Sequence, residues 1–267
     1  MIGTAIVLAM LAWWFFTGAI LLVIRMADRR GGDAYRRAVV LSVPILALGV
    51  AAVMLSGPQT GLGGVYAGFL GALVVWGWIE IAFLTGVITG PEPRPCPPGA
   101  QGRARFWAAW QALAHHEVLL LTGFLGVIVA VHGQPNTVAL WTYAILFCAR
   151  ISAKLNLFFG VPRINLEFIP RPLEHLKSHL RRGPVTMAFP VAITALSFAV
   201  ACFVERLIGA ETLAQTVGFA LLATLAGLAL LEHWLMVLPL PDARLWRWML
   251  PDSEPTNEPK TGRSHGL

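Results

Sequence analysis

The sequence predicts an all-α, polytopic integral membrane protein with seven transmembrane helices. Of its 267 residues, 57% are hydrophobic and only 13% are charged, which is about half the charged share of a soluble domain. The mean hydropathy of +0.68 agrees with this class. Each of seven apolar segments is long enough to cross about 30 Å of hydrocarbon at about 1.5 Å per residue. They cover residues 2–24, 38–55, 62–88, 110–131, 137–159, 185–207 and 213–238.

The composition also excludes several other classes of protein. High apolar content with sparse charge excludes an intrinsically disordered chain. Three cysteines are too few for a secreted disulfide scaffold. The net charge of +6 does not indicate nucleic-acid binding, because the basic residues lie in short segments between apolar runs. Residues 1–24 lack a basic start and a cleavage site, so we expect this segment to remain as the first span.

Basic residues alternate between successive connections, and this alternation predicts the orientation. The connections at 57–61, 132–136 and 208–212 contain no Lys or Arg, whereas the other connections and the tail hold 17 of the 20 basic residues. Because basic loops stay in the cytoplasm, the sequence predicts an outside N-terminus and a cytoplasmic C-terminus. The transmembrane domain is expected to cover 1–250, and the polar, Pro-rich residues 251–267 to form a disordered cytoplasmic tail.

Two of the basic connections have distinctive sequences. The five prolines within 90–99 predict a stiff, extended linker. Residues 172–182 predict a short helix that begins at Pro172. This helix is expected either to lie on the inner lipid surface as a basic amphipathic helix or to form a solvated connector. Its apolar face should contain Leu173, Leu176 and Leu180.

Ionisable residues inside the predicted spans form the candidate site. Each costs roughly 2.5–3.5 kcal/mol at the centre of a membrane, so each should face a partner or a cavity. The alternating direction of the spans places all of them in the cytoplasmic half of the membrane. The candidate cluster contains Glu80, His116, Glu117, Arg150, Lys154, Glu232 and His233, extended by the neutral amide of Asn156.

Two interpretations of this polar cluster remain open. Arg150 and Lys154 lie four residues apart, on one face of a helix, and carboxylates around them would offset most of the cost of burial. The cluster either joins helices or lines a pocket, open to the inner leaflet, for a pigment, a quinone or a lipid-like molecule. An intramembrane histidine such as His132 or His233 could also be an axial ligand of a chlorophyll-type magnesium.

A metal site is a more specific alternative, but the sequence supports it less than it supports the two interpretations of the polar cluster. His175 and His179 form an H-x-x-x-H pair on the predicted short helix and are the weak candidate ligands. Membrane di-iron enzymes use several such histidine clusters, because imidazole and carboxylate suit iron. The histidines of this chain are too sparse for that pattern, so we predict no metal site.

One long segment says more about the protein's family than composition or residue spacing does. Residues 150–182 read Arg-Ile-Ser-Ala-Lys-Leu-Asn-Leu-Phe-Phe-Gly-Val-Pro-Arg-Ile-Asn-Leu-Glu-Phe-Ile-Pro-Arg-Pro-Leu-Glu-His-Leu-Lys-Ser-His-Leu-Arg-Arg. This segment resembles the signature segment of the PuhE-type photosynthetic complex assembly proteins of purple phototrophic bacteria. The Trp-Trp-Phe-Phe-Thr-Gly-Ala-Ile at 13–20 and the pair His116-Glu117 also resemble that family, and the resemblance covers nearly the whole chain.

The resemblance implies a multi-pass protein of the bacterial inner membrane. It would support assembly of the photosynthetic reaction centre and core antenna, or modulate the supply of bacteriochlorophyll. The implied partners are membrane lipids and either reaction-centre and core-antenna subunits or pigment-synthesis proteins; the candidate ligand is bacteriochlorophyll or a precursor. No catalytic residues can be transferred. A membrane-embedded enzyme of pigment or quinone metabolism, acting at the polar cluster, is the alternative function.

Overall fold

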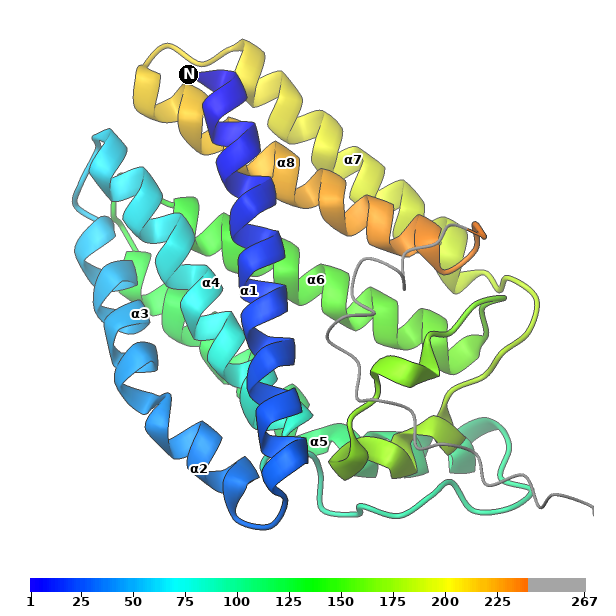
Figure 1. Ribbon diagram of the computed structural model, residues 1–267. Coiled ribbons are helices and arrows are strands. Elements are labelled where there is room, and N and C mark those ends of the chain that lie inside the picture. The colour runs from blue at the N-terminus through cyan, green and yellow to red at the C-terminus, as the bar shows by residue number, and fades with distance from the viewer. Residues whose placement is uncertain (240–267) are drawn as a thin grey trace, which may run out of the picture.

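The computed structural model describes residues 1–239 and confirms the all-α fold class (Figure 1). Within residues 1–239, seven helical segments are long and apolar enough to cross a membrane, with α2 and α3 counted as one, so the chain is a multi-pass membrane protein by helix length and hydropathy. The predicted tail at 251–267 lies outside the described residues. The helices are α1 (Ile2–Arg30), α2 (Ala34–Leu41), α3 (Val43–Ser56), α4 (Leu62–Leu84), α5 (Gly102–Val131), α6 (Val138–Phe159), η1 (Leu166–Phe168), η2 (Arg171–His179), α7 (Ala188–Ile208) and α8 (Leu213–Leu235).

The helix ends differ from the ends of the predicted spans. Helix α1 continues six residues past the expected end to Arg30, and α5 begins eight residues early at Gly102. The extra turns bring charged residues into both helices, Arg29 and Arg30 in α1 and Arg103 and Arg105 in α5. Apolar content marks the part of a helix in the membrane but not where its hydrogen bonding stops. Helix α4 ends four residues early at Leu84, because the chain turns at Gly86 with a positive φ of 73°.

The second span is broken into α2 and α3 at Ser42. Pro44, in the first turn of α3, has no N–H to donate and interrupts the helical ladder. The Ser42 hydroxyl donates to the carbonyls of Ala38 and Val39 at 2.8 and 2.9 Å, and Trp78 Nε1 donates to the Val39 carbonyl at 3.3 Å. A side chain from α4 therefore supports the break.

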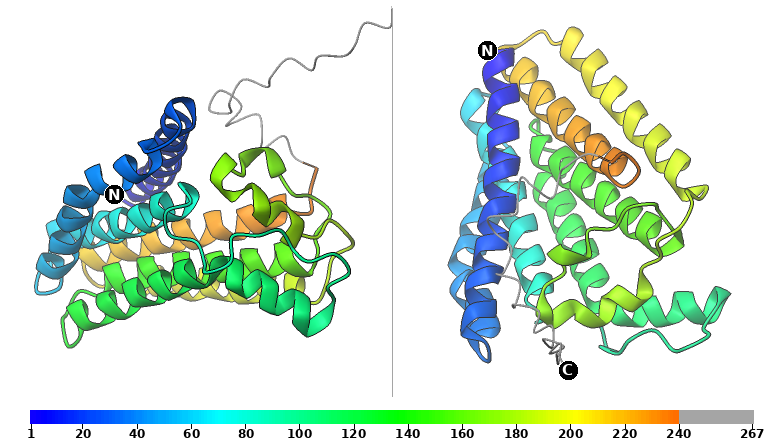
Figure 2. Two further views of the ribbon diagram at one scale, coloured as in Figure 1. Left: turned by 90° about the horizontal axis from the view of Figure 1, so that it is seen from below. Right: turned by 45° about the vertical axis from the view of Figure 1, so that its right-hand side comes forward.

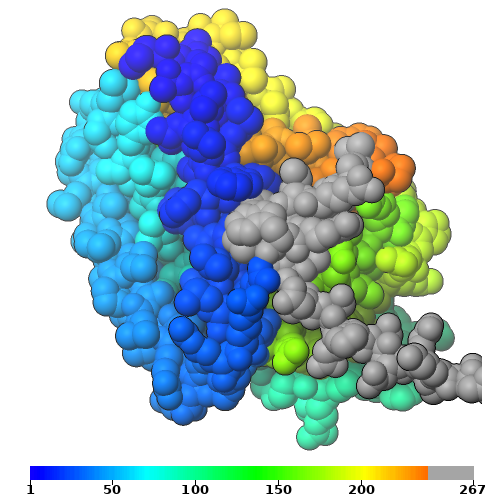
Figure 3. Space-filling model, in the orientation of Figure 1, coloured from blue at the N-terminus to red at the C-terminus, as the bar shows by residue number. Residues whose placement is uncertain are grey.

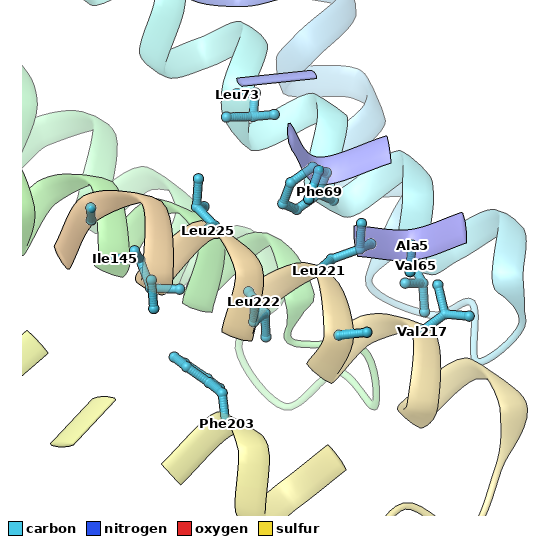
Figure 4. Packing of buried hydrophobic residues seen from close by; sticks show 14 of the residues in the cluster. Ala5, Val65, Phe69, Leu73, Ile145, Phe203, Val217, Leu221, Leu222 and Leu225 are labelled. Atoms are coloured by element: carbon cyan, nitrogen blue, oxygen red, sulfur yellow. The ribbon is translucent and has the colours of Figure 1, made fainter. Parts of the chain in front are cut away.

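Helix α4 is the most buried of the candidate spans in the described chain. Helix α1 crosses one side of it, as the space-filling view shows (Figure 3). Small residues allow α3 to pack closely on the other side: a Cβ added to Gly71 would lie 3.0 Å from the Gly49 carbonyl oxygen. Phe69 of α4 belongs with Leu221 and Leu225 of α8 to the largest apolar cluster of the described residues (Figure 4).

The connections gather at two ends of the molecule. At one end Asn136 donates from its backbone N–H to the Gly57 carbonyl and from Nδ2 to the Ser56 carbonyl, both at 3.1 Å. At the other end the 85–101 and 160–187 connections lie side by side (Figure 2), and the Cys96 N–H donates to Ser178 Oγ at 2.8 Å. We call this second end the basic end. The connections with and without basic residues therefore lie at opposite ends.

Candidate functional site

Two ion pairs connect α6 to its neighbours near the basic end. Arg150 Nη2 lies 2.7 Å from Glu80 Oε2 of α4, and Lys154 Nζ lies 2.5 Å from Glu117 Oε1 of α5. The side chains of the two acids are only 8% and 11% exposed. Each buried acid thus has a base within hydrogen-bonding distance, and such pairing offsets the cost of burying charge.

Aromatic stacking places His116 beside these pairs. His116 is fully buried, and its ring stacks on Phe83 with a centroid distance of 4.0 Å and an interplanar angle of 22°. Lys154 Nζ lies 5.7 Å from the centroid of the same Phe83 ring, and the Arg150 guanidinium carbon 5.8 Å from it. Within residues 1–239, neither ring nitrogen of His116 has a hydrogen-bond partner.

The other candidate residues are held by hydrogen bonds along α6 and α8. His233 is buried, with Nδ1 2.8 Å from the Ala229 carbonyl and Nε2 2.6 Å from Ser152 Oγ. A carbonyl only accepts, so Nδ1 donates to it. Nε2 contacts the Ser152 hydroxyl, which also lies 3.0 Å from the Ala149 carbonyl. Both nitrogens are occupied, which argues against the axial-ligand interpretation of His233. Asn156 is also buried and donates to the Ser152 carbonyl at 2.9 Å.

Glu232 is part of a second polar contact, between α1 and α8. Trp13 Nε1 donates to Glu232 Oε1 at 3.1 Å. Trp13, Glu232, Glu80 and Arg150 line a cavity of about 270 Å³ among α1, α4, α6 and α8. We call it the second cavity.

A larger cavity lies on the other side of Arg150, and we call it the main cavity. It measures about 410 Å³ and lies among the ends of α4, α5 and α6 and the segment 168–180. Its walls are predominantly apolar, and its polar lining includes Glu117, Arg150 and Lys154. Most of the lining residues belong to the segment 150–182, whose sequence carries the family resemblance. An apolar cavity with a few convergent polar groups is the usual form of a small-molecule site.

The predicted short helix covers the main cavity, but it is a 3₁₀ helix. In 3₁₀ geometry residues three apart share a face, so the buried face of η2 contains Leu173, Leu176 and His179. The prediction that Leu180 belongs to the helical face is wrong, because Leu180 lies after the last turn of η2.

The same geometry corrects the expectation for His175 and His179. A spacing of four residues places them a third of a turn apart, and therefore on different faces. His179 is 4% exposed, and its Nε2 lies 3.2 Å from the Arg94 carbonyl. His132 lies on the surface, just after the end of α5. In the described part of the chain, no three His, Cys, Asp or Glu residues are grouped so that they could hold a metal ion.

Arg105 holds the cover of the main cavity in place, although in the sequence it is only one of the 17 basic residues on the connections and the tail. Its Nη2 donates to the Phe158 carbonyl at 2.7 Å and to the His179 carbonyl at 2.8 Å. Its guanidinium also lies over the Phe158 ring, 4.0 Å from the centroid. No local sequence signal links Arg105 to carbonyls 53 and 74 positions away.

We expect Arg105→Ala to loosen η2 and to lower the free energy of unfolding by about 1.5–3 kcal/mol, the range for hydrogen bonds to a charged group. Thermal unfolding of the purified protein measures the loss, and faster tryptic cleavage within 160–183 locates it. Arg103→Ala is the matched control, because Arg103 is exposed two residues earlier. Equal cleavage rates in the two variants would contradict the role of Arg105.

Comparison with known proteins places this architecture in a family. The family described as "Protein of unknown function (DUF3623)" matches residues 1–257. The chain belongs to this family. It is 49% identical over 255 residues to the "Uncharacterized 30.4 kDa protein in puhA 5'region" of Rhodobacter capsulatus, covering 94% of this chain and 93% of that protein. No solved structure matches this DUF3623 protein.

Proposed function

We propose that this DUF3623 protein is an inner-membrane factor for the photosynthetic apparatus. It supports assembly of the reaction centre and core antenna or modulates the supply of bacteriochlorophyll. The observation that carries the proposal is that residues 150–182, which resemble the signature of PuhE-type assembly proteins, supply most of the main cavity and both cations of the ion pairs. The relative named for the puhA 5′ region comes from a photosynthetic bacterium, which supports the same role.

A deletion strain tests this function. We expect loss of the protein to lower or delay the accumulation of reaction-centre and antenna complexes, measured by near-infrared absorption during the shift from aerobic to phototrophic growth. Respiratory growth should be unchanged, because the role concerns the photosynthetic apparatus alone. Expression of the full chain in the deletion strain should restore the absorption. Normal absorption throughout the shift in the deletion strain would rule out the role.

We also propose that the basic end faces the cytoplasm. Hydrogen bonds group the uncharged connections near Gly57 and Asn136 at one end and the basic connections near Cys96 and Ser178 at the other, and basic loops remain cytoplasmic. This orientation puts the main cavity in the inner leaflet, where an amphiphile could enter it from the lipid.

Reporter fusions test the orientation. Fusions at Gly61 and Gln134 should report the periplasm, and fusions at Gly32, Gly99 and Gly183 the cytoplasm. With the N-terminus outside, a fusion that follows an odd number of the seven spans lies in the cytoplasm, and one that follows an even number lies in the periplasm. Each position is fused both to alkaline phosphatase, which is active in the periplasm, and to green fluorescent protein, which fluoresces in the cytoplasm. The two signals at one position control for expression. A cytoplasmic signal at Gln134 would contradict the seven-span topology.

A further inference from the structure

The main cavity has the shape of a site for a small amphiphile. Trp110 and Leu113 of α5, Ile151 of α6 and Leu173 and Leu176 of η2 provide apolar walls. The volume of about 410 Å³ falls near the lower end of the range of about 300–1,000 Å³ for small-molecule sites. This volume suits a single ring or ester group with part of a tail, rather than a complete tetrapyrrole.

Hydrogen-bond donors remain available at the polar wall of this cavity. Arg150 and Lys154 line it, and their side chains keep 33% and 17% of their surface accessible. A guanidinium has five N–H donors and an ammonium three, and neither can accept a hydrogen bond. The pairs with Glu80 and Glu117 use only part of this capacity. The donor set therefore recognises an acceptor oxygen.

The charge balance selects the kind of acceptor. Two carboxylates already neutralise the two cations, so a carboxylate or phosphate head would add an uncompensated charge at a largely buried site. A carbonyl oxygen accepts from the same donors without adding charge. The second cavity supplies no extra positive charge that would attract an anion. It adds the acid Glu232 beside Glu80 and Arg150.

We propose that the main cavity binds a small, uncharged, carbonyl-headed amphiphile, such as a membrane quinone, with its carbonyl oxygen accepting hydrogen bonds from Arg150 and Lys154. Its alkyl or isoprenoid tail lies between α5, α6 and η2. This proposal goes beyond the role in photosynthetic assembly and stands apart from it, because binding is measured on the purified protein alone.

Three probes with tails of nearly equal length, a decyl chain on the quinone and a nonyl chain on the ester and the acid, test the head group. Purified full-length protein in nanodiscs is titrated with decylubiquinone, methyl decanoate or decanoate, and the rise in unfolding temperature gives an apparent affinity. We expect at least one carbonyl probe to bind at least tenfold more tightly than decanoate. Decylubiquinone binding more tightly than methyl decanoate identifies a quinone head, and the reverse order identifies an ester lipid. Decanoate binding most tightly, or none of the three binding, overturns the proposal.

Matched variants test the location of the site. Ala109 lines the main cavity, whereas Ala201 is exposed on α7. Ala109→Trp should weaken binding of the preferred probe at least tenfold by filling the cavity, and Ala201→Trp should leave binding unchanged. The double variant Glu117→Gln/Lys154→Met keeps the charge balance but removes the ammonium donors. It should bind about tenfold more weakly. Unchanged affinity in both Ala109→Trp and the double variant would exclude the main cavity.

Discussion

Arg150→Ala is expected to lower the free energy of unfolding by about 3–5 kcal/mol, because it leaves a buried charge without its partner. The Glu80 side chain is only 8% exposed, and Arg150 Nη2 binds its Oε2 at 2.7 Å. The loss should appear as a lower unfolding temperature of the purified protein and as less folded protein in the membrane. An unchanged temperature and level would mean that Glu80 reaches water or lipid headgroups.

Two matched carboxylate substitutions identify the partner. Glu80→Gln in the Arg150→Ala background removes the unpaired charge and should recover most of the lost stability. Glu117→Gln in the same background should not, because Glu117 pairs with Lys154 at 2.5 Å. It should instead lower stability further by leaving Lys154 unpaired. Equal recovery by both substitutions would show that the four charges act as one pool rather than as two pairs.

The rescued variant also separates a structural from a ligand-binding role of Arg150. If the ion pair only joins α4 to α6, the Arg150→Ala/Glu80→Gln protein should restore photosynthetic complexes in the deletion strain. If Arg150 also binds a ligand in the main cavity, protein level should return while those complexes stay low. Measuring both quantities in the same cells therefore distinguishes the two interpretations that the sequence left open.

The number and class of the helices follow directly from the sequence. An apolar run of about 20 residues can satisfy its backbone within a membrane only as a helix, so seven such runs predict seven spans. The helix ends do not follow from this argument. The α1 helix continues through polar residues to Arg30, and α4 ends where Gly86 turns the chain. Local hydrogen bonding and backbone conformation decide both ends.

The sequence predicts which charged residues come together, but it does not predict how they pair. The direction of each span places Glu80, Glu117, Arg150 and Lys154 at similar depth, and the structure brings all four together. Which acid faces which base depends on the rotation of α4 and α5 about their axes, and no periodicity in one sequence reports this rotation. The 3₁₀ form of η2, whose Leu173 and Leu176 pack against Phe83 of α4 and Ala112 of α5, likewise has no signal in the sequence.

A close backbone contact at Gly90 is another feature without a sequence signal. The prolines around Gly90 predict only a linker, yet the first residues of this linker contact the backbone of α5. The Thr89 carbonyl accepts from the His116 N–H at 2.9 Å, and the Glu92 N–H donates to the Gln111 carbonyl at 3.3 Å. A Cβ on Gly90 would overlap the Gln111 carbonyl oxygen and lie 2.7 Å from the Leu113 backbone nitrogen. Only glycine allows this approach.

Gly90→Ala is therefore expected to lower the free energy of unfolding by about 3 kcal/mol, combining the cost of overpacking with the loss of these two hydrogen bonds. The colliding atoms belong to the backbone of α5 and cannot rotate away, so the linker must move off the helix and expose Ala112 and His116. Thermal unfolding of the purified protein measures the loss. Gly227→Ala is the matched control, because Gly227 lies inside α8 with nothing within 4 Å of an added Cβ. That control should be neutral or stabilising by up to about 1 kcal/mol. If Gly90→Ala unfolds at the same temperature as Gly227→Ala, the linker does not contact α5 and cannot hold His116 against Phe83.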